Sequence, residues 1–450
     1  MITESEVAPQ SSIGTTLAER FRTVRAATLA FITPLSAEDM MVQSRAEASP
    51  VKWHLAHTSW FFETFVLTPF LPGYRHFHPD FHWLFNSYYT SLGDMPEKKL
   101  RASFSRPPLE QILAYRTHVD HAVEALLQRQ ADEDRDEVIR RVSLGLEHEQ
   151  QHLELAATDI KHALFTNPLH PAYLGAAPGR AATSTTASAF LPFQGGLTRI
   201  GVTPDPTDAQ AFAFDNETPQ HTVFLQPYAI ASRLVTSAEY LAFVNDNGYT
   251  RPELWLSEGW STMRAESWQA PLYWVRDAAV QSAWKVYTLH GFVPLDALLE
   301  SPVCHLSFFE ADAFARWAGC RLPTEFEWEH AAKTPLAAHA PLPLDANMLE
   351  SGALHPLPAR PATTLGQMFG DVWEWTSSGY TGYPGYRPLP GALGEYNGKF
   401  MSSQVILRGG SCVTPATHIR ATYRNFFSPA TRWQFSGLRL AKDVSVEASS

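Results

Sequence analysis

Two histidines, His148 and His152, lie four residues apart in a stretch whose apolar residues recur at helical spacing. Side chains four positions apart lie one above the other on one helix face, so both imidazoles could bind one metal ion. Glu154 follows His152 by only two positions, about 200° further round at 3.6 residues per turn. We therefore expect Glu154 to have a structural or supporting role and not to be a ligand.

A third ligand is expected from another helix, because metal sites in helical bundles are built from facing helices. The segment from Trp53 to His57 offers two candidates, His54 and His57. Three neutral imidazoles leave coordination positions open for a substrate or oxygen, which is typical of a catalytic site. These ligands alone do not distinguish zinc from iron, and a polar helix stripe without a metal is the alternative interpretation.

The helices that must position these histidines are predicted within the first 168 residues. Apolar residues recur there every three or four positions, and prolines separate the periodic stretches. The pattern predicts helices at residues 16–32, 51–67, 109–128 and 134–165. Residues 13–168 are therefore expected to form a four-helix bundle.

The composition changes after the predicted bundle. Residues 169–189 are rich in Pro, Gly, Ala, Ser and Thr with almost no charge, which is typical of a linker. Residues 190–443 hold many aromatic side chains and short strand-like runs, such as 221–231 and 404–411. Two capping boxes predict helix starts in this part, Ser307 with Glu310 and Thr324 with Glu327. The predicted fold class is α+β, with an N-terminal bundle and a C-terminal mixed domain.

The overall composition excludes several classes of function. The 450 residues carry 35 basic and 46 acidic side chains, and a net charge of -11 makes nucleic acid an improbable partner. No signal peptide and no apolar run of about 18 residues is present, so we expect no membrane partner. The three cysteines cannot form a disulfide framework, which favours a cytoplasmic location.

Five motifs of the second half identify a resemblance. They are Thr236–Tyr240, Arg321–Glu329, Gly370–Thr376, Arg408–Ser411 and Gly437–Arg439. Together with the histidines, they resemble the nonheme iron sulfoxide synthases of ergothioneine biosynthesis, the EgtB type. That family joins a DinB-like four-helix bundle to a domain like the formylglycine-generating enzyme, which is C-type-lectin-like. The resemblance covers roughly residues 15–442.

The resemblance implies a set of metal and substrate contacts. By this similarity the Fe(II) ligands are His57, His148 and His152, and His54 is a packed or hydrogen-bonded neighbour. Gln151 matches the residue that contacts the trimethylhistidine substrate, and Asn425 matches a substrate-pocket position. The active site is then expected between the two domains.

One departure from the family pattern concerns the sulfur donor. Actinobacterial members have Asn-Trp-Asp and then an arginine, which hold a γ-glutamyl group, whereas this chain has Asn425-Phe426-Phe427 and Thr431. Two phenylalanines cannot pair the charges of a glutamyl extension. Free cysteine is therefore the predicted donor, as in the subgroup with the Phe-Phe signature. The alternative is γ-glutamylcysteine, with Arg432 replacing the missing cation.

A second departure concerns the proton donor. The actinobacterial active-site tyrosine precedes a Glu-Tyr pair, but in this chain the matching position, three residues before Tyr396, is Leu393. The bundle instead offers Tyr88 and Tyr89, which resemble a paired-tyrosine subgroup, and either phenol could act as an acid. Arg101 is a candidate partner for a substrate carboxylate, since its planar fork binds carboxylates in a bidentate manner.

The activity implied by the resemblance is oxidative C–S bond formation. Hercynine, cysteine and O2 are the expected reactants, and a sulfoxide of the coupled product is formed. The nearest alternative is an ovothiol-type synthase, which couples cysteine to unmethylated histidine. A zinc-dependent thiol transferase, a formylglycine-generating enzyme and a lectin-like binding module are further alternatives. No Ser-His-Asp order, P-loop or dinucleotide-binding motif competes with them.

Overall fold

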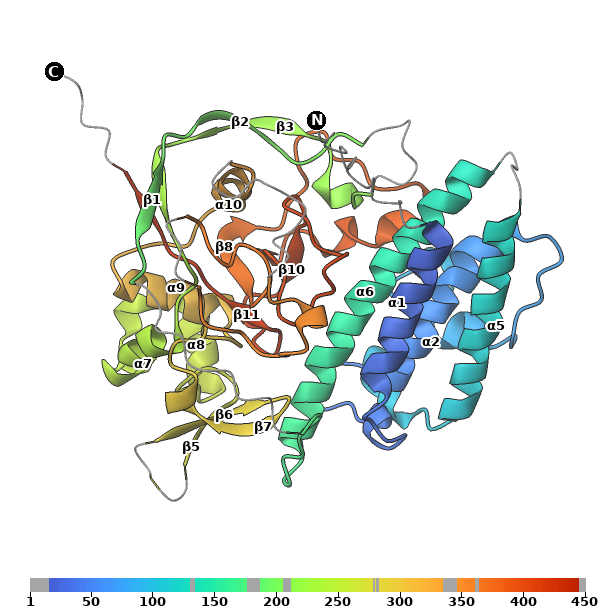
Figure 1. Ribbon diagram of the computed structural model, residues 1–450, viewed down its shortest axis with the longest axis horizontal. Helices are drawn as coiled ribbons and strands as arrows, with labels where there is room; N and C mark the ends of the chain where they lie inside the picture. The colour runs from blue at the N-terminus through green and yellow to red at the C-terminus, as the bar shows by residue number, and fades with distance from the viewer. Residues whose placement is uncertain are drawn as a thin grey trace, which may run out of the picture.

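The computed structural model describes residues 16–129, 134–175, 187–204, 212–277, 280, 283–334, 346–360 and 364–444. Two parts are visible in Figure 1, a helical bundle and a mixed domain that packs along one side of it. None of the helices in the described ranges combines the length and apolar character that crossing a bilayer requires. The predicted α+β class is confirmed.

Four long helices form the bundle, and each matches a predicted one. They are α1 (Leu17–Ile32), α2 (Val51–Phe62), α5 (Leu109–Gln128) and α6 (Arg135–Thr166). Helix α2 packs against both α5 and α6, and α1 packs against α6. Every residue of α2 is buried, so its apolar side chains and its histidines all face other parts of the protein. Two short helices follow in the connections, α3 (Thr68–Phe70) and α4 (Phe81–Leu84).

The end of the second predicted helix differs from the prediction. Regular α-helix stops at Phe62, and residues Glu63–Leu67 form a π-helical turn. Pro69 lacks an amide hydrogen, so it cannot donate to the carbonyl of Phe65 as a regular helix requires. The guanidinium of Arg141 on α6 donates to that carbonyl instead, at 3.1 Å. Apolar periodicity carries no signal for this change.

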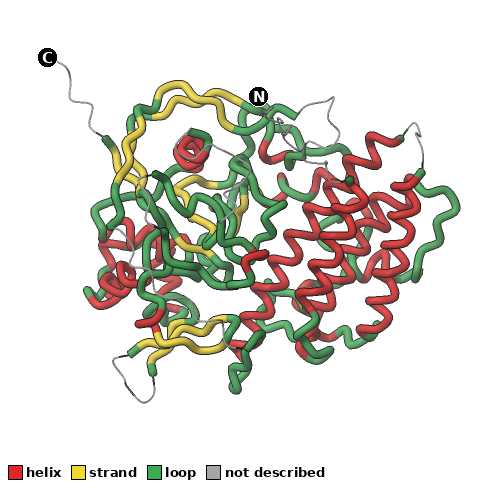
Figure 2. The backbone as a smooth tube through the Cα atoms, in the orientation of Figure 1, coloured by secondary structure: helices red, strands yellow, loops and turns green. Residues whose placement is uncertain are grey.

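The described strands of the second domain are short and lie in four sheets. The first sheet has the order β1 (Phe190–Phe193), β4 (Tyr228–Ala231), β12 (Ala441–Asp443). The second has the order β10 (Asn425–Phe427), β9 (Val405–Arg408), β8 (Trp373–Gly379), β11 (Ser436–Gly437). The others are the pair β2 (Gly196–Ile200) with β3 (His221–Leu225), and β5 (Trp274–Arg276), β6 (Trp284–Thr288), β7 (Gly291–Pro294). Figure 2 shows these strands scattered among long loops.

In the described part of this domain, four helices accompany the strands. They are α7 (Ser237–Asn245), α8 (Ser257–Ala265), α9 (Phe308–Trp317) and α10 (Glu325–Ala332). Both predicted capping boxes are formed at the starts of α9 and α10, and a third caps α7. The predicted linker lies partly outside the described residues. Its first part packs on both domains, since Tyr173 stacks on Phe31 of α1 and the Leu174 amide donates to the Leu289 carbonyl at 3.0 Å.

Helix α6 is the element that both domains share. It lies between α1 and the second domain in Figure 1. On its domain-facing side, the buried carboxylate of Glu154 accepts hydrogen bonds from three side chains of the second domain: Trp373 Nε1 at 2.5 Å, Ser411 Oγ at 2.9 Å and Thr414 Oγ1 at 2.8 Å. Glu154 therefore docks the second domain onto the helix that carries His148 and His152, which agrees with its expected structural role.

Candidate metal and substrate site

The structure brings the three predicted ligands together. His57 on α2 and the pair His148 and His152 on α6 each offer one nitrogen, and these nitrogens lie within 4.8 Å of one another. All three side chains are buried. Their meeting follows from the four-residue spacing on α6 and from the packing of α2 against that helix. Within the described part of the chain, no other group of at least three His, Cys, Asp or Glu residues has this geometry.

Hydrogen bonds at the far side of two rings fix their tautomers. Nδ1 of His57 lies 2.7 Å from the carbonyl oxygen of Phe85, and a carbonyl can only accept, so Nδ1 carries the proton. Nδ1 of His152 lies 2.8 Å from Nδ1 of His54, whose Nε2 lies 3.2 Å from the Asp159 carboxylate.

The Asp159 carboxylate also accepts, so His54 donates to it from Nε2 and receives a hydrogen bond from His152 at Nδ1. This arrangement leaves Nε2 of both His57 and His152 as an unprotonated nitrogen. His54 is thus a hydrogen-bonded neighbour of the triad, as the sequence comparison with the family implied.

The donor set fits a metal ion. Nδ1 of His148 is buried and has no hydrogen-bond partner. Burial lowers the pKa of His148 to about 3, and it lowers the pKa of His57 and His152 well below the ordinary value. All three rings are therefore neutral near pH 7, which is the form that binds metals.

A cavity of about 520 Å³ lies beside the triad, between the two domains. His152, Gln151 and Leu155 of α6 form one wall, and strand β10 and Trp373 belong to the other domain. The predicted residues on its lining are Tyr88, Arg101, Gln151, His152, Asn425, Phe426 and Phe427. His57, His148 and Tyr89 are not among the residues of this lining. We call this space the central cavity.

Arg101 contributes an unneutralised positive charge to the central cavity. Its side chain is buried, and its guanidinium donates to the hydroxyls of Ser49 at 2.8 Å and Ser87 at 2.9 Å. The guanidinium carbon lies 3.4 Å from the centre of the Trp53 ring. Burial lowers the pKa of Arg101 to about 10, so it remains charged near pH 7. These hydrogen bonds of the buried cation go to neutral hydroxyls, and such a cation is suited to a substrate carboxylate.

The two predicted tyrosines occupy different positions. Tyr88 lines the central cavity and has a left-handed backbone, with φ of 70°. Burial acts to raise its pKa, but the cations of Lys98 and Arg101 outweigh this effect and hold the pKa below the ordinary value. Tyr89 is fully buried, its hydroxyl has no hydrogen-bond partner, and it borders a small crevice together with His148.

A third tyrosine, Tyr396, was not predicted as a site residue. Its ring centre lies 5.5 Å from that of His148, and it borders both the central cavity and the crevice at Tyr89. Burial raises its pKa well above the ordinary value. The family pattern drew attention to Leu393, three positions earlier, and no residue spacing signals that Tyr396 faces a histidine of another domain.

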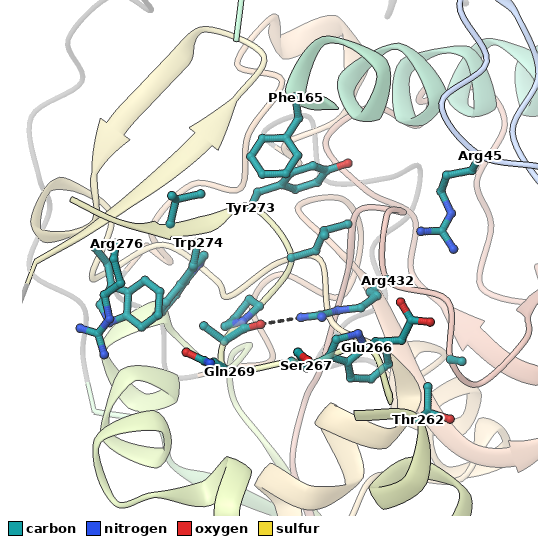
Figure 3. A pocket seen from close by; sticks show the side chains of 17 residues that line it. Arg45, Phe165, Thr262, Glu266, Ser267, Gln269, Tyr273, Trp274, Arg276 and Arg432 are labelled. Carbon is teal, nitrogen blue, oxygen red and sulfur yellow. Dashed lines mark hydrogen bonds between the residues drawn. The ribbon is translucent and has the colours of Figure 1, made fainter. Parts of the chain in front are cut away.

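The sequence alternative that Arg432 supplies a cation to the substrate is not favoured by its position. Arg432 is absent from the lining of the central cavity, which Thr431 reaches instead. It lines a second cavity of about 510 Å³, where it donates to the Ala270 carbonyl, as Figure 3 shows. Its charge is paired with Glu310 at 2.7 Å. In the central cavity, Phe426 stacks on Tyr380 with ring centres 4.1 Å apart.

Comparisons with known proteins agree with this architecture. Residues 20–156 match the DinB superfamily, and residues 177–444 match the sulfatase-modifying factor enzyme 1-like domain. The predicted boundaries at 13–168 and 190–443 remain predictions. A hercynine oxygenase of Mycolicibacterium thermoresistibile is 33% identical over 427 residues, which are 88% of this chain and 88% of that protein. A hercynine oxygenase of Mycolicibacterium smegmatis is 34% identical over 329 residues, 68% of this chain and 72% of that protein.

A more distant relative comes from a fungus. The ergothioneine biosynthesis protein 1 of Schizosaccharomyces pombe is 28% identical over 240 residues, 52% of this chain and 28% of that protein.

The two domain matches and the two mycobacterial relatives define the class of this protein. It is an oxygenase in which a DinB bundle is joined to a sulfatase-modifying-factor-like domain. It belongs to the hercynine oxygenase family.

Proposed function

We propose that this protein is an Fe(II)- and O2-dependent sulfoxide synthase of ergothioneine biosynthesis. It joins the thiol sulfur of cysteine to imidazole C2 of hercynine, the trimethylated betaine of histidine, and oxidises that sulfur to a sulfoxide. The S–H and C2–H bonds are broken and a C–S and an S=O bond are formed. One O2 accepts the four electrons, so one oxygen atom enters the product and the other leaves as water.

One observation carries this proposal, the histidine triad beside a cavity between the two domains. A ferrous ion held by His57, His148 and His152 would supply open coordination positions and the redox chemistry that O2 requires. The cavity of about 520 Å³ is large enough for a small amino acid and a betaine together. His152 lies on its lining, so substrates in the cavity lie next to the triad.

The residues of the cavity bind and orient the substrates. Arg101 offers a buried cation to a substrate carboxylate, and Gln151 and Asn425 offer amide groups on opposite walls. Holding the sulfur and C2 close together converts a bimolecular encounter into an intramolecular one. Tyr88 and Tyr89 supply a proton near the triad.

Cysteine is the donor that the cavity favours. Where a glutamyl group would need charged partners, the lining offers Phe426, Phe427 and Thr431. Arg432 is already paired with Glu310 at the other cavity. Burying an unpaired glutamyl charge at this position would cost more free energy than the packing of the added atoms would gain.

The test is anaerobic reconstitution of the protein with Fe(II), or with Zn(II) as a control, followed by O2 and defined substrates. Hercynine or histidine is combined with cysteine or γ-glutamylcysteine, and products are identified by mass spectrometry. We expect the hercynine–cysteine sulfoxide with iron and none with zinc. Preferred turnover of γ-glutamylcysteine would overturn the donor assignment, preferred turnover of histidine would indicate an ovothiol-type reaction, and full activity without iron would refute the proposal.

A further inference from the structure

A chain of hydrogen bonds links the Gln151 amide to a carboxylate deeper between the domains. Nε2 of Gln151 donates to the hydroxyl of Tyr423 at 2.5 Å. That hydroxyl lies 3.0 Å from Nε2 of His418. Nδ1 of His418 lies 2.5 Å from the carboxylate of Glu147, which is also paired with Arg20. Glu147, His418 and Tyr423 are buried, and none of these three was predicted from the sequence as a site residue.

The direction of each hydrogen bond follows from the chemistry of the groups. Nε2 of Gln151 donates to the Tyr423 hydroxyl oxygen, so the single proton of that hydroxyl is directed to Nε2 of His418. Nδ1 of His418 then donates to the Glu147 carboxylate. The same carboxylate is paired with Arg20 and lies 3.6 Å from Arg420.

The chain consequently fixes which end of the Gln151 amide faces Tyr423. The nitrogen is held by the hydroxyl oxygen, and Oε1 remains without a hydrogen-bond partner. Gln151 and Tyr423 both line the central cavity, beside His152. If the Gln151 amide were reversed, Oε1 would lie beside the Tyr423 hydroxyl. That hydroxyl could not donate to Oε1, because its single proton is donated to His418.

We propose that Glu147, His418 and Tyr423 are positioning residues that hold the Gln151 amide with its oxygen toward the cationic group of the substrate. This inference rests on the proposed function, in which the substrate is a betaine. A quaternary ammonium group cannot donate a hydrogen bond, so only the partial negative charge of an oxygen or an aromatic face attracts it. The orientation of the amide dipole then decides whether Gln151 attracts or repels this group.

The first variant that tests the inference is Tyr423→Phe, which keeps the ring and removes the hydroxyl. We expect KM for hercynine to rise about three- to tenfold, the range that loss of one hydrogen bond produces, while kcat stays within about twofold. Tyr228→Phe is the matched control, because its buried hydroxyl donates to the Glu327 carbonyl at 2.9 Å away from the cavity. His418→Phe removes both ring nitrogens and is expected to raise KM in the same way.

A double-mutant cycle separates positioning from a merely structural role. If Tyr423 acts through Gln151, the variant with both Gln151→Ala and Tyr423→Phe has the same KM as Gln151→Ala alone. Additive effects, or a fall in kcat at constant KM, would overturn the inference, as would an unchanged KM in Tyr423→Phe. The wild-type protein must turn over hercynine in the same assay. If it does not, the proposed function fails, whatever the role of the hydrogen bonds between Gln151 and Glu147.

Discussion

At the scale of single residues, the proposed function depends on three imidazoles whose protonation is set by their neighbours. A carbonyl at Phe85 and the Asp159–His54 pair direct the unprotonated nitrogens of His57 and His152. Groups that are hydrogen-bonded to a metal-binding histidine affect the affinity for the metal, because they orient the ring and fix its tautomer. The residues around the triad are therefore as testable as the triad itself.

The triad predicts that His148→Ala abolishes iron binding. The substitution leaves two imidazoles, and three protein ligands are what an open catalytic site of this kind requires. We expect the iron content after anaerobic reconstitution, measured by mass spectrometry of the metal, to fall from about one per chain to near zero. His162→Ala on the same helix is the control, since His162 bonds to Ser44 and lies outside the triad. Equal iron in both variants would contradict the assignment.

A second prediction concerns Asp159. In Asp159→Asn the carboxylate that orients His54 is replaced by a neutral amide, so the tautomer of His152 is no longer fixed. Loss of such an outer contact typically weakens metal affinity about 10- to 100-fold. Competition with a chelator at constant pH measures the change. An affinity equal to that of the wild type would show that the His54 contact is only packing.

The third residue-scale prediction concerns the phenols. We expect the variant with both Tyr88→Phe and Tyr89→Phe to divert turnover toward oxidation of cysteine to its sulfinic acid, because the proton donor for sulfoxide formation is lost. The two single variants show which phenol acts, and the ratio of sulfoxide to sulfinic acid is the readout. Unchanged sulfoxide formation in the double variant would leave Tyr396 as the remaining phenol beside His148.

At the scale of the elements, the site depends on close packing between α2 and α6. Gly145 lies one turn before Glu149 on α6, and a Cβ atom at Gly145 would lie 2.5 Å from the ring of Phe62. The absence of a side chain at position 145 thus allows the two helices that carry the proposed ligands to approach each other. The neighbouring carboxylate, Glu149, is fully buried and paired with Arg25 and Arg116, which tie α6 to α1 and α5.

This packing predicts that Gly145→Ala destabilises the bundle. An added methyl group in a close-packed core typically costs about 1–3 kcal/mol, more than the gain in helix propensity of alanine over glycine. We expect a lower Tm in calorimetry, together with weaker iron binding as α2 and α6 move apart. Gly175→Ala is a suitable control, because no atom lies within 4 Å of the added Cβ at that position. A Tm shift equal to that of the control would refute the close-packing argument.

The helices were predictable from the sequence because their buried faces repeat with a local period. The π-helical turn at Glu63–Leu67 was not, since it depends on Pro69 and on an arginine of α6 that is distant in sequence. The same distinction applies to the site. The pairing of His148 with His152 follows from local spacing, but the choice of His57 as the third predicted ligand came from a family resemblance. The contact of Gln151 with Tyr423 joins residues 272 positions apart.

At the scale of the whole molecule, the central cavity exists only while the two domains remain docked. Glu154 fixes α6 to the second domain, and Glu395 fixes the loop that carries the predicted tyrosines. The Glu395 carboxylate accepts from the backbone amides of Thr90 and Ser91, both at 3.0 Å, and from the Thr90 hydroxyl at 2.7 Å. Lys399 adds an ion pair at 3.1 Å. This carboxylate therefore positions Tyr88 and Tyr89 relative to the second domain.

The Glu395 contact predicts a specific dependence of stability on pH. Burial acts to raise the pKa of this carboxyl group, but the hydrogen bonds from Ser91, Thr90 and Lys399 outweigh it and lower the pKa to about 2. The ionised form is favoured in the folded state, so its contribution to stability is fully present above the ordinary pKa, near 4.5, and is lost as the pH falls toward 2. In Glu395→Gln, stability at pH 7 should be lower than in the wild type, and the difference should be constant above about pH 5.5.

Thermal unfolding of both proteins between pH 2 and pH 8 measures this difference. We expect the two Tm curves to converge as the pH is lowered from about 5 toward 2, because protonation removes from the wild type the same charge that the substitution removes. Glu253→Gln is a control, since Glu253 pairs at the surface with Arg251, two residues before it. Parallel curves across the whole range would mean that the charge of Glu395 does not hold the tyrosine loop. A neutral side chain at position 395 would then accept the hydrogen bonds from Thr90 and Ser91 equally well.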